Sequence, residues 1–92
     1  MSPARQPVSP QRQVHNRLNR AHGQLAGVIR AVEAEAPCGE VIQQLAAVSA
    51  ALQRAGFLII ATAMRRCLDP AIVPETPSNT PEELEKLFMM LA

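Results

Sequence analysis

Two cysteines, Cys38 and Cys67, are the residues in this sequence whose chemistry is most distinctive. A thiolate is both a nucleophile and a soft metal ligand, so a pair can hold a metal ion, form a disulfide or react with sulfur compounds. No Ser/His/Asp set and no paired carboxylates accompany them, and the sequence therefore argues against an enzyme. What the cysteines can do depends on the elements that hold them.

The segment between the two cysteines is predicted to form one continuous helix over residues 38–68. It contains no proline, and its only internal glycine beyond the first turn, Gly56, costs about 1 kcal/mol. Side chains that suit a core recur at helical spacing, at Val41, Ile42, Leu45, Val48, Leu52, Ala55, Leu58, Ile59 and Thr62. They cover more than one face, as in a helix at the centre of a core. Because the chain has only 92 residues, that core is expected to include a second copy of it.

A helix of this length keeps the two cysteines of one chain apart. At a rise of 1.5 Å per residue, the roughly 29 residues between them correspond to roughly 43 Å. A site that uses both needs two chains with antiparallel long helices, so that Cys38 of one chain meets Cys67 of the other. The helix N-terminus at Cys38, and Arg65 and Arg66 beside Cys67, would stabilise thiolates. The alternative is two unrelated cysteines that act as small apolar residues.

Two further helices are predicted, at about residues 10–35 and 81–91. Ser9 and Pro10 match an N-cap followed by proline at the first helical position. A heptad stripe then follows at Val14, Leu18, Ala21, Leu25, Val28 and Val32. Pro37 cannot continue this helix. Thr80 and Glu83 match a capping box for the short last helix. The chain is therefore expected to be all-α, with a disordered tail at 1–8 and a single domain at 9–92.

The charge distribution is asymmetric although the net charge is only +1. The first thirty residues contain no acidic residue and carry Arg5, Arg12, Arg17, Arg20 and Arg30. This fits a polyanionic partner, and an ordinary solvated face is the alternative. The N-terminus has no apolar segment typical of a signal peptide, and the longest apolar run, FLIIATAM, is too short to cross a bilayer. We therefore expect a cytoplasmic protein without a membrane partner.

Several stretches together resemble the copper-sensing operon repressor (CsoR) family: RLNRAHGQLAGVIRAVE, then Cys38, EVIQQLAAVSAAL and the RRC at 65–67. The resemblance extends over about residues 14–90. It implies an all-α bacterial repressor, built as an antiparallel helical dimer that pairs into a disc-like tetramer. It also implies binding to operator DNA without a helix-turn-helix, through basic positions that match Arg17, Arg20 and Arg54, and release of DNA when the sensing site is loaded.

One position departs from the family's copper sensors. These use a cysteine at the position of Cys38 with a histidine and a cysteine of the partner chain in an H-x-x-x-C arrangement; here Cys67 matches the cysteine, but Ala63 occupies the histidine position. The bare dithiol resembles the persulfide-sensing CstR-like branch, whose cysteines become joined across chains by di-, tri- or tetrasulfide links. The expected inducers are reactive sulfur species such as persulfides or polysulfide, with no cofactor. The alternative is Cu(I) held by Cys38 and Cys67.

Other candidate residues have weaker patterns. His15 and His22 lie seven residues apart on one predicted helix and could hold a metal, although solvated or phosphate-contacting histidines show the same spacing. Glu83 lies near a family position that supports the metal site, but the capping box already explains it. A rival function is a helical interaction module that binds no DNA, which a steep salt dependence of DNA binding would exclude.

Overall fold

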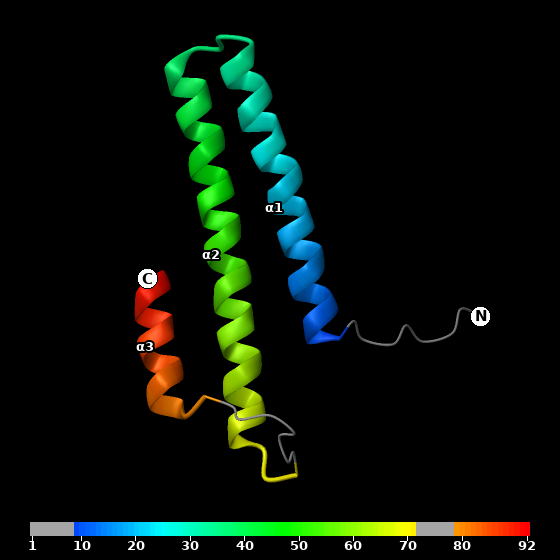
Figure 1. Ribbon diagram of the computed structural model, residues 1–92, viewed down its shortest axis with the longest axis vertical. Helices are drawn as coiled ribbons and strands as arrows, with labels where there is room; N and C mark the ends of the chain where they lie inside the picture. The colour runs from blue at the N-terminus through cyan, green and yellow to red at the C-terminus, as the bar shows by residue number, and fades with distance from the viewer. Residues whose placement is uncertain (1–8, 72–78) are drawn as a thin grey trace, which may run out of the picture.

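The chain folds as three helices in the computed structural model, which describes residues 9–71 and 79–92. The helices are α1 (Pro10–Glu33), α2 (Cys38–Leu68) and α3 (Pro81–Leu91), and the described residues contain no strand. Figure 1 shows α1 and α2 as an antiparallel hairpin, with the shorter α3 on the other side of α2. The all-α class is thus confirmed. The tail expected at 1–8, and residues 72–78 between α2 and α3, lie outside the described residues.

The ends of α1 follow from short-range hydrogen bonds. The Ser9 hydroxyl accepts a hydrogen bond from the Arg12 amide at 3.2 Å, and Pro10 occupies the first turn, which confirms the predicted N-cap. At the other end, Glu35 has a φ of 55°, in the left-handed region. The Ala36 amide donates to the Ala31 carbonyl at 3.0 Å, which closes a Schellman motif. This motif ends α1 at Glu33, two residues before the limit predicted from the sequence.

Helix α2 runs without interruption for 31 residues, from Cys38 to Leu68. The predicted single helix between the cysteines is therefore confirmed. Few side chains are buried in the described part of the chain, and most of them are small: Ala21 and Val28 of α1, Val48 and Ala55 of α2, and Leu84 of α3. Alanine and valine on facing helices allow α1 and α2 to pack closely.

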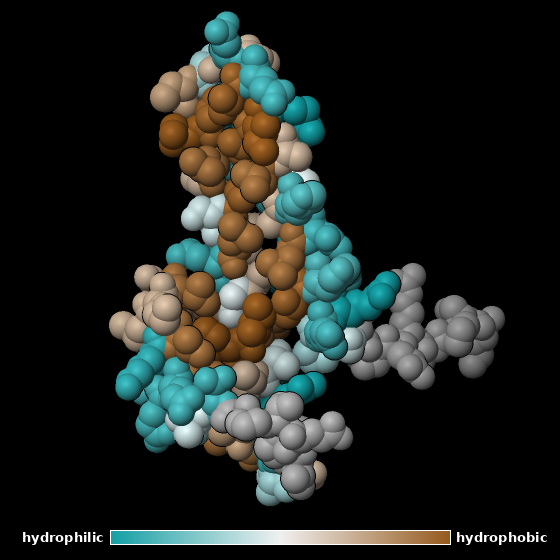
Figure 2. All heavy atoms as spheres, viewed as in Figure 1, coloured by the Kyte–Doolittle hydropathy of each residue, from teal (hydrophilic) through white to brown (hydrophobic). Residues whose placement is uncertain are grey.

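Large apolar side chains remain exposed along both long helices. They include Leu18, Leu25, Ile29 and Val32 of α1 and Ile42, Leu45, Leu52 and Ile59 of α2, each at least 40% exposed. We call this set the apolar band; Figure 2 shows apolar side chains gathered over the upper ends of α1 and α2 and continuing down between them. Contiguous apolar surface on this scale is typical of an interaction site.

The apolar composition of α2 also determines whether this helix could cross a membrane. By length and composition α2 is long and apolar enough to cross a bilayer. The expectation that its apolar run is too short was wrong, because the alanines and other small residues between the large side chains also count as apolar over a longer window. A long apolar helix that packs in the centre of a core passes the same test, so this property alone assigns no membrane.

Helix α3 lies along the C-terminal half of α2 (Figure 1). Leu84 is buried, and the rings of Phe57 and Phe88 lie 5.1 Å apart between their centroids. At the start of α3, the Thr80 hydroxyl accepts a hydrogen bond from the Glu83 amide at 3.2 Å, which confirms the predicted cap. A complete capping box also has a bond from the Thr80 amide to the Glu83 carboxylate. That part of the prediction was wrong, because the Glu83 carboxylate accepts from the Asn79 side-chain amide at 2.9 Å instead.

Candidate thiol site and DNA interface

Cys38 is the first residue of α2 and is exposed to solvent with a free thiol. Pro37 occupies the N-cap position and has no side-chain oxygen to bond the first amides of the helix. Its carbonyl accepts instead from the amides of Glu40 and Val41, at 3.0 and 3.2 Å. The thiol of Cys38 therefore lies at a helix N-terminus that no side chain caps.

Cys67 lies in the last turn of α2 and is half-buried with a free thiol. Arg65 and Arg66 occupy the same turn. The structure thus places the two predicted sensing residues at opposite ends of one straight helix and does not bring them together within a chain. At the helical rise of 1.5 Å, their separation remains roughly 43 Å. A site that contains both thiols requires a partner chain.

A pocket of about 490 Å³ adjoins the Cys67 end of α2. It lies where the first turns of α1 meet the last turns of α2, and its lining consists of Pro10, Gln11, Val14, Ile59, Thr62, Ala63, Arg66 and Asn79. Ala63 is one helical turn before Cys67 and on the same face. Sequence reasoning singled out Ala63 but missed the pocket, because its walls come from segments about fifty residues apart in the sequence. The antiparallel pairing of the two long helices was the available signal.

The described residues contain no cluster of three or more His, Cys, Asp and Glu side chains that could hold a metal ion. His15 contacts the Asn19 side-chain amide through Nδ1 at 3.2 Å, and His22 is exposed. Glu83 is occupied by its bond to Asn79. Within a single chain, Cys38 and Cys67 are therefore separate thiols that belong to no such cluster in the described part of the molecule.

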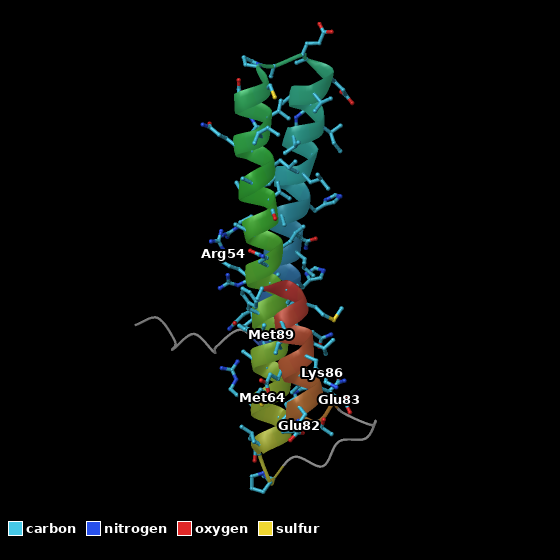
Figure 3. All side chains as sticks on the ribbon, turned by 90° about the vertical axis from the view of Figure 1, so that its left-hand side faces the viewer. Arg54, Met64, Glu82, Glu83, Lys86 and Met89 are labelled. Atoms are coloured by element: carbon cyan, nitrogen blue, oxygen red, sulfur yellow. The ribbon has the colours of Figure 1, made fainter. Side chains whose placement is uncertain are left out.

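The three arginines predicted to contact DNA are all exposed. Arg17 and Arg20 line a groove of about 260 Å³ on α1, together with Gln13 and Asn16. Arg54 does not line this groove; it projects from α2 near the C-terminal end of α3 (Figure 3). In the described part of the chain no carboxylate forms an ion pair with any of the three, so their charges are available to phosphates.

Comparison with known proteins assigns the chain to a family. The family described as "Metal-sensitive transcriptional repressor" matches residues 10–91. The chain belongs to this family, which confirms the resemblance to CsoR-type repressors.

Individual relatives agree with the family match. The chain is 38% identical, over 58 residues, to the copper-sensing transcriptional repressor CsoR of Mycobacterium ulcerans (strain Agy99), covering 63% of this chain and 50% of the relative. It is 32% identical over 69 residues to the repressors of the same name from Mycobacterium bovis (strain BCG / Pasteur 1173P2) and Mycobacterium tuberculosis (strain ATCC 25618 / H37Rv), covering 75% of this chain and 58% of each relative. The chain thus spans about half the length of these relatives. No solved structure matches the chain.

Proposed function

We propose that this chain is a cytoplasmic, DNA-binding transcriptional repressor that senses persulfides or polysulfide through Cys38 of one protomer and Cys67 of its partner. The observation that carries the proposal is Ala63. It lies one turn before Cys67, at the position where the resemblance to the family's copper sensors requires a histidine ligand. An alanine side chain cannot ligate a metal, and a reaction between two thiols and sulfane sulfur needs no metal.

The apolar band supports the dimer that the proposed site needs. Its side chains come from both long helices and are left open by a single chain. Two chains can cover these surfaces if the hairpins pair antiparallel, since an isologous interface buries the same patch on both protomers. This pairing brings each Cys38 to a Cys67 of the other chain and creates two equivalent dithiol sites. The tetramer implied by the family resemblance would pair two such dimers.

The proposed sensing reaction balances without an external oxidant, because the sulfane sulfur is reduced. The Cys38 thiolate attacks the outer sulfur of a persulfide RS–SH, so that a Cys38 persulfide forms and the thiolate RS⁻ leaves. The thiolate of Cys67 from the partner then attacks Sγ of Cys38, which gives a disulfide and releases HS⁻. If further sulfur atoms are transferred to Cys38 before the Cys67 thiolate attacks, the link becomes a tri- or tetrasulfide. Each link joins opposite ends of two α2 helices covalently, which we expect to shift the helices and lower the affinity for DNA.

DNA binding in this proposal depends on Arg17, Arg20 and Arg54. Guanidinium groups bind phosphates and can read guanine edges, and each phosphate contact releases condensed counterions. The basic first thirty residues and the absence of ion pairs on these three side chains, within the described residues, support the assignment. A helical interaction module without DNA would show no such salt dependence.

A second candidate function is supported by the relatives, which are named as copper-sensing repressors. Cu(I) accepts two thiolate ligands, so the same two cysteines could bind it across the dimer. The two functions differ in the product that each inducer leaves on the protein. A metal adds its own mass and is removed by a chelator, whereas sulfur transfer leaves a covalent link that a chelator does not reverse.

Mass spectrometry after parallel treatment with polysulfide and with Cu(I), together with operator binding, tests the proposal. We expect polysulfide to yield crosslinked chains that carry added sulfur atoms and to release DNA, while Cu(I) releases DNA poorly. DNA release by Cu(I) at stoichiometric metal, with no crosslink after polysulfide, would establish the copper sensor instead.

A further inference from the structure

We infer that the pocket beside Ala63 binds the carboxylate of an organic persulfide, with Arg66 as the residue that recognises it. This inference rests on the proposed function and specifies which sulfur donors the dithiol site prefers. The donor class is a persulfide of a small thiol that carries a carboxylate, as opposed to inorganic polysulfide.

The size of the pocket supports an organic donor. A volume of about 490 Å³ lies within the range of small-molecule sites, whereas a chain of a few sulfur atoms would leave most of it unfilled. Ala63 fills little of this space, because its side chain ends at Cβ. Val14, which lies outside the apolar band, provides apolar wall against which the methylene groups of a thiol compound can pack.

The polar lining supports a donor that is anionic. Arg66 is the charged side chain that lines the pocket, and no ion pair or hydrogen bond occupies its guanidinium in the described part of the chain. A guanidinium binds a carboxylate through two parallel hydrogen bonds, which fixes the orientation of the bound group. Gln11 provides a side-chain amide at the same pocket. The side-chain nitrogen of Asn79 donates to Glu83, which leaves its carbonyl oxygen as an acceptor for an N–H of the donor.

The position of Arg66 relates this anion site to the sulfur chemistry. Arg66 directly precedes Cys67, and Ala63 lies one turn before Cys67 on the same face. A donor whose carboxylate binds Arg66 therefore has its sulfane sulfur at the end of α2 where the proposed dimer brings Cys38 of the partner. Sulfur transfer to that thiolate breaks the S–S bond of the donor, forms the Cys38 persulfide and releases the donor's thiolate with its carboxylate unchanged.

Two donors that differ only in the carboxylate test this inference. They are the persulfides of N-acetylcysteine and of N-acetylcysteamine, and the measurement is the initial rate of crosslink formation in the full-length protein, read by mass spectrometry. We expect the parent to react faster with the carboxylate-bearing donor. Arg66→Gln should reduce that preference by roughly ten- to hundredfold, the value of a hydrogen-bonded charge. A general effect of Arg66 on the Cys67 thiolate would change both rates by the same factor and leave the preference intact.

Arg65→Gln is the matched control, because it removes an equal charge from the same turn but Arg65 does not line the pocket. Its donor preference should equal that of the parent. Inorganic tetrasulfide separates failure of this inference from failure of the proposed function. If tetrasulfide crosslinks the parent but Arg66→Gln keeps the full preference for the carboxylate donor, the pocket assignment is wrong and the sensing function stands. If neither tetrasulfide nor the organic persulfides crosslink the parent, both are wrong.

Discussion

Leu91 of α3 lies against Gly56 of α2 so closely that a Cβ atom on residue 56 would come within 2.5 Å of the Leu91 Cδ1 atom. One turn away, the side-chain amide of Gln53 donates a hydrogen bond to the Leu91 carbonyl at 2.8 Å. The last turn of α3 is therefore attached to α2 by an apolar contact in which a side chain at residue 56 would displace the Leu91 side chain, and by a polar contact that satisfies a terminal carbonyl. Both contacts lie next to Arg54 in the sequence, which relates the docking of α3 to the proposed DNA interface.

Gly56→Ala is expected to loosen the end of α3. The new methyl group displaces Leu91 and weakens the Gln53 bond, so the amides in the last turn of α3 should exchange hydrogen faster. Gly27→Ala is the control, because its Cβ would meet only Arg30, at 3.7 Å. That substitution should stabilise the protein by up to about 1 kcal/mol, the difference in helix propensity between the two residues. An equal gain from both substitutions, with unchanged exchange in α3, would contradict the close packing of Leu91.

Glu35→Gly is expected to raise the free energy of unfolding. Glu35 holds a left-handed conformation, which costs an L-residue with a side chain roughly 1–2 kcal/mol and costs glycine far less. Chemical denaturation should therefore show a gain of about 1 kcal/mol. Glu33→Gly removes the same charge from the last residue of α1, where the backbone is helical, and should lower stability by a similar amount. If both variants lose stability, the Schellman motif at this turn is not the end of α1 in solution.

Cysteine variants should separate the two steps of the sensing reaction. Cys38→Ser is expected to abolish the response to polysulfide, because Cys38 is assigned as the attacking thiolate. Cys67→Ser should accumulate a persulfide on Cys38 without a crosslink, since the second thiolate is missing. Peptide mapping of the crosslinked parent should find links between Cys38 and Cys67 only. Links that join Cys38 to Cys38 would be incompatible with antiparallel pairing of α2.

Substitution of the assigned arginines should weaken operator binding without unfolding the protein. Arg17→Ala, Arg20→Ala and Arg54→Ala are each expected to reduce the dependence of log affinity on log salt concentration by about one, the effect of one lost phosphate contact. Arg30→Ala removes an exposed arginine of α1 outside this set and should keep the parental slope. Parental slopes in all three variants would move the DNA interface to another face of the molecule.

Ala63→His is expected to raise the affinity for Cu(I) by a large factor. The imidazole would project from the same face as Cys67 and add a nitrogen ligand to the two thiolates without moving the backbone. Ala63→Gln fills similar space without an imidazole and serves as the control. A competition titration with a Cu(I) chelator measures the difference. A parent that already holds Cu(I) as tightly as Ala63→His, and releases DNA when loaded, would be a copper sensor with an unusual ligand set.

The sequence was sufficient for the features that depend on local chemistry. Residue types at fixed offsets predict the N-caps at Ser9 and Thr80 and the continuity of α2, and the structure has all three features. Glutamate is an uncommon residue in the left-handed region, so the turn at Glu35 that ends α1 at Glu33 could not be predicted from residue preference. The Gly56–Leu91 contact could not be predicted either, because it depends on how far α3 extends back along α2.

The candidate site was predictable only in part, because it too depends on contacts between helices. Spacing along one helix showed that Cys38 and Cys67 of a single chain are far apart, and the structure agrees. The pocket that contains Ala63 and Arg66 also requires Gln11 and Asn79, which come from segments far apart in the sequence. Antiparallel pairing brings such segments to the same end of the molecule, but the exact crossing of the helices decides which residues line a cavity, and the residue pattern of one chain does not specify that crossing.

The unbroken length of α2 has a consequence for how the family can change over evolution. With a reactive thiol at each end, two antiparallel copies meet correctly only if the helix has a fixed number of residues. Insertion of one residue anywhere between Cys38 and Cys67 would rotate one end by about 100° relative to the other and lengthen the helix by about 1.5 Å. In the proposed dimer, that single event would misalign both dithiol sites at once. The interior of α2 should therefore accept many substitutions between small apolar residues but almost no insertions or deletions, because the number of residues in the helix sets the distance between its two thiols.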